Sequence, residues 1–182
     1  MPAEGLTPTS YLVLGCLARN GPSTPYDLKQ FVGETLGYFW SFPHSQLYSE
    51  PPRLVERGLL VEEREESGRR RRTFSITREG QDALREWLAD PTPEPTGIRD
   101  VALLKLFFGT LSTPEDVVAL ARNQEQSHRQ RLETYETIDA ELPSPADEHS
   151  RATLHLGLAY ERAAVAFWAS IAESPPRRPK GR

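Results

Sequence analysis

The sequence has little of what stabilises secreted or membrane-bound proteins. It contains one cysteine, Cys16, which cannot form an intrachain disulfide and which we expect to be buried in a core helix within a reducing compartment. The apolar run at residues 10–18 is too short to span a bilayer, and the first residues lack the pattern of a secretory signal. We therefore predict a cytoplasmic protein with no membrane association.

The signatures of common enzymes are also absent from the sequence. It has no glycine-rich phosphate loop, no nucleophile elbow, no cysteine pair and no His-Glu-x-x-His motif. Glu125 and His128 have the spacing of a ligand pair in a di-metal helix bundle, but that chemistry needs the motif twice, with two further glutamates. We predict that the protein is not an enzyme and has no catalytic residue, no metal site and no other cofactor.

Positive charge is not in excess. The formal net charge is −4, and the first ninety residues carry eleven Lys or Arg against thirteen Asp or Glu, a formal charge of −2. This balance argues against a protein that coats nucleic acid indiscriminately. Any affinity for DNA must come from where the charges are placed.

One segment of the first half is typical of a recognition helix. Leu47, Pro51 and Leu54 recur at helical spacing, and Gly58 stands where a helix C-cap favours a left-handed residue. A helix that ends at Arg57 is therefore expected. Pro51, which Pro52 follows, lacks an amide donor and crowds the preceding turn, so we also expect a bend or an irregular turn inside this helix.

The residues that follow predict a two-stranded wing. Residues 59–66 and 70–77 flank the turn signal Ser67-Gly68. The tip would carry four arginines suited to phosphate oxygens or a narrow minor groove, and the acidic strand before them is expected to restrain some of them while no DNA is bound. A solvated surface turn is the alternative interpretation. The arginines are Arg69, Arg70, Arg71 and Arg72.

Polar residues at the start of the predicted recognition helix are candidates for reading bases. Their donors and acceptors can reach base edges in the major groove, which admits a helix. Tyr48 has two interpretations, a phosphate contact or packing onto the core. The candidate DNA-binding residues of this segment are His44, Ser45, Gln46, Tyr48 and Ser49.

The order of the elements predicts a winged helix-turn-helix. A helix start is expected at Thr24-Pro25, where threonine caps and proline fits the first helical position, and another helix is expected to start at Thr77 after the wing. The predicted fold is mainly α with a small β-hairpin, an N-terminal winged helix-turn-helix followed by a C-terminal helical dimerisation domain.

These motifs together resemble the PadR family of bacterial transcriptional regulators. The resemblance rests on Tyr48, on residues 53–59 (Arg-Leu-Val-Glu-Arg-Gly-Leu), on the arginine-rich wing and on residues 75–80. It implies a homodimeric repressor that binds double-stranded DNA at a pseudo-palindromic operator, although the larger AphA-like subgroup, which the long C-terminal helices resemble, includes an activator. The alternative function is a winged-helix module that binds protein or RNA and has no operator.

The second half is predicted to be a helical domain that forms a dimer. We expect four segments: the DNA-binding domain at 1–90, a Pro-rich linker at 91–97, a helical domain at 98–173 and a flexible basic tail at 174–182. Helices are expected at 98–108, 114–142 and 146–173. The last of these has apolar residues on two sides, and a partner subunit would cover the excess. The alternative interpretation is that these residues pack only within their own chain. The interface candidates are Leu154, Leu158, Val165 and Trp168.

The resemblance also implies a small apolar or aromatic effector. Members of the family respond to phenolic acids, planar drugs or fatty acids. Large flat side chains suit a mostly apolar pocket, but each of them has an ordinary core or interface role as its alternative. The candidate pocket residues are Trp40, Phe107, Phe108, Tyr160 and Trp168.

Overall fold

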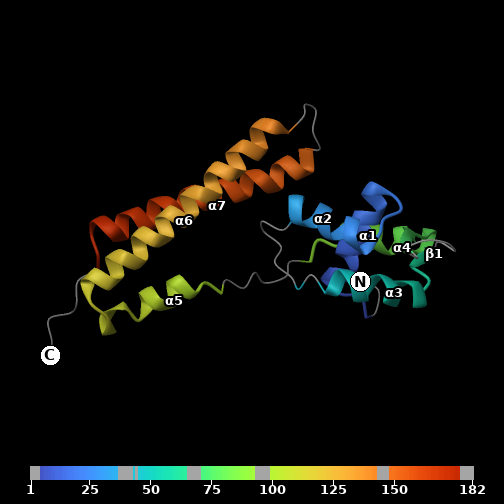
Figure 1. Cartoon of the computed structure of the whole chain (residues 1–182), viewed down its shortest axis with the longest axis horizontal. Helices are drawn as coiled ribbons and strands as arrows, with labels where there is room; N and C mark the ends of the chain where they lie inside the picture. The colour runs from blue at the N-terminus through green and yellow to red at the C-terminus, as the bar shows by residue number, and fades with distance from the viewer. Residues whose placement is uncertain are drawn as a thin grey trace. The chain divides into compact units, whose positions relative to one another are not determined.

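The structure is a computed structural model that describes residues 5–36, 43, 45–64, 71–92, 99–142 and 148–176. The chain divides into two units, residues 1–95 and 96–182, and we describe each by itself. In Figure 1 the first unit is coloured from blue to green, and the second from yellow-green to red.

The first unit has the element order of a winged helix-turn-helix, as predicted. Three helices precede an antiparallel hairpin, whose strands pair Leu60 with Ile76 and Arg64 with Arg72, and a fourth helix follows. The elements are α1 (Pro8–Asn20), α2 (Pro25–Thr35), α3 (Gln46–Glu56), β1 (Leu60–Arg64), β2 (Arg72–Ile76) and α4 (Arg78–Ala89).

Local capping explains where these elements begin and end. Thr24 caps α2 in a reciprocal pair with Asp27, with proline at the start of the helix, and Thr77 caps α4. Beyond the C-cap of α3, Gly58 has a φ of 74°, the left-handed conformation that glycine adopts without strain. Helix α3 therefore stops where the sequence predicted, with Arg57 as its C-cap.

Helix α3 runs without interruption through both of its prolines, so the irregular turn expected at Pro51 is absent, and the expected bend stays a prediction. Pro51 lies in the second turn, where its missing amide removes only the hydrogen bond to the carbonyl of Leu47. Its ring is buried beside Leu47 and Leu54, so apolar burial offsets that loss. The α3 backbone thus remains a regular helix that a DNA groove admits.

The core of the first unit fixes the wing as well as the helices. The buried residues include Val13, Leu28, Leu54 and Phe74, and the phenol ring of Tyr11 stacks on Trp87 with centroids 4.5 Å apart. The backbone of Ser23 exchanges two hydrogen bonds with that of Phe74, at 3.0 and 2.9 Å. This bridge ties β2 to the chain just before α2, so the wing is held by more than the pairing of its two strands. Cys16 is buried, as expected, and desolvation raises the pKa of its thiol to about 11.

The second unit is a pair of long helices with a short helical segment before it. Helices α6 (Pro114–Glu141) and α7 (Glu148–Glu173) lie side by side (Figure 1), and α5 (Val101–Phe107) and the single-turn η1 (Gly109–Leu111) precede them. Tyr135 of α6 packs against Gly157, where an added β-carbon would come within 3.0 Å of its ring.

Of the predicted helix starts in this unit, that of α6 is correct and that of α5 is too early. The start of α6 is confirmed, since Thr113 and Asp116 form the predicted capping box. The predicted start of α5 at residue 98 is wrong. Asp100 is the N-cap, with its carboxylate accepting hydrogen bonds from the amides of Ala102 and Leu103 at 2.7 and 3.2 Å. The helix therefore begins at Val101.

Within the described part of the chain, none of the helices combines the length and the apolar character that crossing a bilayer requires.

Candidate nucleic-acid interface

Helix α3 presents a polar face and buries an apolar one. Leu47, Pro51 and Leu54 are buried, whereas Ser45 and Ser49 are exposed and Tyr48 keeps 49% of its surface exposed. The interpretation of Tyr48 as a core residue is therefore wrong. An exposed phenol on this face can donate a hydrogen bond to a phosphate or a base edge.

Gln46 is half-buried and has a partner inside the protein. The hydroxyl of Thr9 in α1 donates a hydrogen bond to Gln46 Oε1 at 2.8 Å. This contact orients the side-chain amide with Nε2 as its remaining donor. His44, the other candidate at this end of α3, lies outside the described residues.

A partly buried polar cluster joins α3 to α1. The hydroxyl of Ser10 donates to Glu50 Oε1 at 2.6 Å, and Arg53 makes two contacts to the same carboxylate, at 3.0 and 2.6 Å. Burial opposes ionisation of Glu50, but hydrogen bonds from Arg53 and Ser10 hold the pKa of its carboxyl below the ordinary value. No local pattern in the sequence indicates this cluster, because Ser10 lies 40 residues before Glu50 and 43 before Arg53.

In the wing, Arg72 is bound to a glutamate of the paired strand. Arg72 Nε lies 2.6 Å from Glu62 Oε1 and Nη2 lies 3.0 Å from Oε2, while Arg64 Nε approaches Oε1 at 2.5 Å. Hydrogen bonds from Arg72 and then Arg64 lower the pKa of the Glu62 carboxyl to about 2. The expectation that acidic residues restrain wing arginines is confirmed for Arg72.

Arg71 is also paired, more loosely, with a residue of another element. Its Nη2 lies 3.3 Å from Asp27 Oδ2 in the first turn of α2. The pKa of the Asp27 carboxyl is lowered chiefly by hydrogen bonds from the Thr24 backbone and hydroxyl, and further by Arg71. Arg69 and Arg70 lie outside the described residues.

An open cleft brings these parts together. It has a volume of about 490 Å³ and combines the start of α2, the exposed side of α3, the first residue of β2 and the residue before it. Tyr26 and Tyr48 both contribute exposed phenol rings. The lining residues are Thr24, Pro25, Tyr26, Asp27, Tyr48, Arg71 and Arg72. Two guanidinium groups beside a polar helix face are suited to a nucleic-acid backbone.

The candidate effector residues do not share one environment. Phe107 and Phe108 are 78% and 52% exposed, Tyr160 is 51% exposed, and Trp168 is only 2% exposed because it packs on Ala102 and Ala121. Phe108 alone of these lines the groove of about 700 Å³ that runs from Leu104 to Asn123. Trp40 lies outside the described residues.

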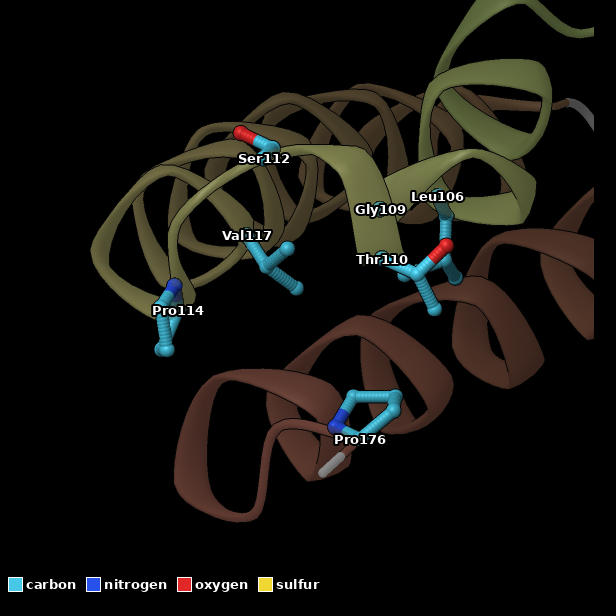
Figure 2. Close-up of a pocket in the computed structure, with 7 residues that line it drawn as sticks. All are labelled: Leu106, Gly109, Thr110, Ser112, Pro114, Val117 and Pro176. Carbon is cyan, nitrogen blue, oxygen red and sulfur yellow. The ribbon is translucent and has the colours of Figure 1, made fainter. Parts of the chain in front are cut away.

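A second hollow in the same unit is small. Its volume is about 70 Å³, whereas an apolar cavity that holds benzene is roughly 150 Å³. Figure 2 shows its lining from α5, η1, the start of α6 and the chain after α7: Leu106, Gly109, Thr110, Ser112, Pro114, Val117 and Pro176. As it stands, this hollow is too small for an aromatic effector.

The interface candidates of α7 fall on its inward side. Leu158 and Trp168 are 4% and 2% exposed within the single chain, so their burial needs no partner, and Leu154 and Val165 are half-buried. The exposed apolar residues lie on the other side of the helix: Leu156, Tyr160 and Phe167. The side of α7 that carries the predicted interface residues is therefore the side that packs within the chain.

His128 has a structural environment rather than a metal one. Its Nδ1 lies 2.6 Å from Glu161 Oε2 in α7, and Arg131 contacts the other carboxylate oxygen at 3.2 Å. Across the described ranges no three His, Cys, Asp or Glu side chains gather in a way that could hold a metal ion.

Comparison with known families finds a match for each unit. The model described as the transcriptional regulator PadR-like family matches residues 13–86. The model described as the virulence activator alpha C-term matches residues 98–173.

Individual relatives extend these matches to nearly the whole chain. The negative transcriptional regulator PadR of Bacillus subtilis (strain 168) is 28% identical over 142 residues, which cover 77% of this chain and 78% of the relative. The crystal structure of Bacillus subtilis PadR in complex with operator DNA matches with a TM-score of 0.80 at 25% identity, over 91% of this chain and 97% of that one. The same protein in complex with p-coumaric acid matches with a TM-score of 0.74 at 26% identity, over 90% and 96%.

Proposed function

This chain belongs to the PadR-like family of transcriptional regulators, and we propose on that premise that it represses transcription by binding operator DNA as a homodimer. The observation that carries the proposal is the cleft in which the exposed face of α3 meets Arg71 and Arg72. The solved complex of the Bacillus subtilis relative with operator DNA supports it. Because the chain acts on DNA, we also infer that it works in the cytoplasm.

The geometry assigns different tasks to the helix and to the wing. Helix α3 has 11 residues, about 16 Å at 1.5 Å per residue, and a helix of this size fits the major groove. Ser45, Gln46 and Ser49 on its polar side are proposed to contact bases. Arg71 and Arg72 are proposed to contact phosphates, which give affinity without sequence preference.

The local charges explain how an acidic chain binds DNA. Several carboxylates of this unit are neutralised by arginines, since Glu50 is bound by Arg53, Glu62 by Arg72 and Arg64, and Asp27, which lines the cleft, by Arg71. Tyr26 and Tyr48 add exposed hydroxyl groups that carry no charge. The affinity for DNA is therefore attributed to the positions of the charged side chains and not to an excess of positive charge.

A salt-dependence measurement tests the proposal. The full chain is titrated by fluorescence anisotropy against duplexes from upstream of its own gene and against scrambled duplexes. We expect operator binding at least about a thousandfold tighter than binding to scrambled DNA, and affinity that falls with added salt. Binding that is indifferent to both sequence and salt would instead favour the alternative, a winged-helix module that contacts protein or RNA.

We further propose that the regulator responds to a phenolic acid. The p-coumaric acid complex of the relative supports this ligand class, and Phe107, Phe108 and Tyr160 offer exposed aromatic surface. The ligand must prefer the arrangement that does not bind DNA, because equal affinity for both arrangements shifts neither. Tryptophan fluorescence during titration with p-coumaric acid and related phenolic acids measures binding, and anisotropy measures release of operator DNA. Binding without release would exclude a switch.

A further inference from the structure

We propose that Asp27 and Glu62 are internal counter-charges that hold Arg71 and Arg72 in the free protein and thereby set how tightly the wing binds DNA. The inference rests on the proposed DNA-binding function and adds to it a pair of affinity-limiting carboxylates. Both pairs lie beside or within one cleft, and both consist of described residues.

The carboxylates are the fixed partners of these pairs. Asp27 Oδ2 accepts hydrogen bonds from the amide and the hydroxyl of Thr24, at 2.9 and 2.8 Å, as part of the cap of α2. The side chain of Glu62 is 12% exposed and also binds Arg64. The guanidinium groups are freer, with the side chains of Arg71 and Arg72 58% and 41% exposed.

A DNA phosphate would compete with these carboxylates for the same donors. Carboxylate and phosphate oxygens both accept charge-assisted hydrogen bonds from a guanidinium group, often two at a time. Arg72 already spends two such bonds on Glu62, so a phosphate must displace or share them. Ionised Asp27 and Glu62 also repel a phosphate that approaches the cleft.

The two pairs differ in strength, which gives the wing two levels of restraint. Arg71 makes one contact of 3.3 Å with Asp27, whereas Arg72 makes two contacts of 2.6 and 3.0 Å with Glu62. Arg71 is therefore released more easily. Hydrogen bonding lowers the pKa of both carboxyls, so both stay charged at neutral pH and a competing anion, not a proton, opens the pairs.

The test replaces each carboxylate by an amide of nearly the same size and shape, so only the charge is removed. The full-chain variants Glu62→Gln and Asp27→Asn are titrated against operator and scrambled duplexes over a salt series. Each is expected to bind both duplexes about two- to fivefold more tightly than the unsubstituted chain, the range expected for breaking one exposed ion pair. Arginines released from carboxylates are expected to engage phosphates, so the dependence of affinity on salt should steepen.

A matched control separates pairing from net charge. Glu63 is the next residue of β1 and is exposed, and its carboxylate forms none of the ion pairs found among the described residues. Glu63→Gln makes the same change in net charge and should tighten binding less than Glu62→Gln does. Equal effects at positions 62 and 63 would overturn the proposal, because general repulsion would then explain both.

A double-mutant cycle gives a second, independent readout. With Arg72→Gln already present, Glu62→Gln should tighten binding much less than it does in the unsubstituted chain, because the arginine that it would release from the cleft is gone and the lost repulsion and the freed Arg64 are what remain. Additive effects would overturn the proposal even if the single variants bind more tightly.

Failure of this inference can be told apart from failure of the proposed function. If the unsubstituted chain shows no salt-dependent binding to any duplex, both the proposed function and this inference fail. If that chain binds and the cycle is additive, only the counter-charge inference fails. Because Asp27 also caps α2, thermal unfolding of Asp27→Asn is measured alongside.

Discussion

Gly80 in the first turn of α4 lies directly against the carbonyl group of Leu59, so closely that the structure has no room for a β-carbon at position 80. Such a β-carbon would also come within 2.9 Å of Ile76. Because backbone atoms cannot move aside as a flexible side chain can, we predict that Gly80→Ala lowers the free energy of unfolding by about 1–3 kcal/mol. Thermal and urea unfolding followed by circular dichroism measure the change.

The control for this prediction is Gly33→Ala in α2. Gly33 is exposed, and a β-carbon there would meet no atom within 4 Å. Alanine in a helix interior is favoured over glycine by about 0.5–1 kcal/mol, so this variant should be slightly more stable. Equal stability of the two alanine variants would show that the contact between α4 and Leu59 relaxes freely.

A second prediction concerns the buried contact between α6 and α7. His128 and Glu161 are each 4% exposed, and Arg131 binds the same carboxylate with its side chain 46% exposed. Glu161→Leu removes the carboxylate from buried His128 and leaves the Arg131 guanidinium, 2.8 Å from Nδ1, beside the ring, so the variant is predicted to cost about 3 kcal/mol of stability. The double variant His128→Leu, Glu161→Leu should recover most of that loss, because Arg131 can turn to solvent. Chemical denaturation measures the free energy of unfolding of both variants, and equal destabilisation of the two would contradict the prediction.

The sequence predicted those features that depend on neighbouring residues. The caps at Thr24 and Thr113 are each completed by an acidic residue three positions later, so the starts of α2 and α6 could be read directly. Gly58 likewise marks the end of α3. Asp100 is a weaker signal, because it caps α5 without an acidic or amide residue three positions later, and apolar Ile98 before it extends the predicted helix too far.

Features that depend on distant residues could not be predicted. Helical spacing divides α7 into two apolar sides, but it does not tell which side α6 covers, and Trp168 was therefore assigned to an interface. Pro51 is tolerated in α3 because a core formed by other helices buries its ring. The pairing of Arg71 with Asp27 joins residues 44 positions apart, a separation that no local pattern encodes.

A third prediction concerns base readout by Gln46. Its amide is held by Thr9 with Nε2 as the donor that remains, which suits an acceptor on a base edge. We predict that Gln46→Ala weakens operator binding by about 1–3 kcal/mol and leaves binding to scrambled DNA nearly unchanged. Thr9→Val keeps the amide on the helix but removes its orienting partner, so its loss should be smaller. Equal losses on operator and scrambled duplexes would remove Gln46 from the residues that read sequence.

The last prediction concerns the surface that joins two copies of the chain. Leu156, Tyr160 and Phe167 are 73%, 51% and 41% exposed and follow one another at helical spacing, so they form a stripe on the side of α7 opposite Leu158. Burying such a stripe against a second copy is favourable, and a two-fold interface contains every substituted residue twice. The stripe therefore replaces Leu158 and Trp168 as our candidate for the interface.

We predict that the double variant Leu156→Lys, Phe167→Lys raises the dissociation constant of the dimer by about two orders of magnitude or more, because fully burying each such side chain contributes roughly 1.5–3 kcal/mol. Light scattering after size-exclusion chromatography, over a range of concentrations, measures the shift, and operator affinity should fall with it. Ala166→Lys is the control, since Ala166 is exposed but lies roughly 100° around the helix from Phe167. A dimer that survives the double variant, or one that Ala166→Lys disrupts equally, would place the interface on another surface.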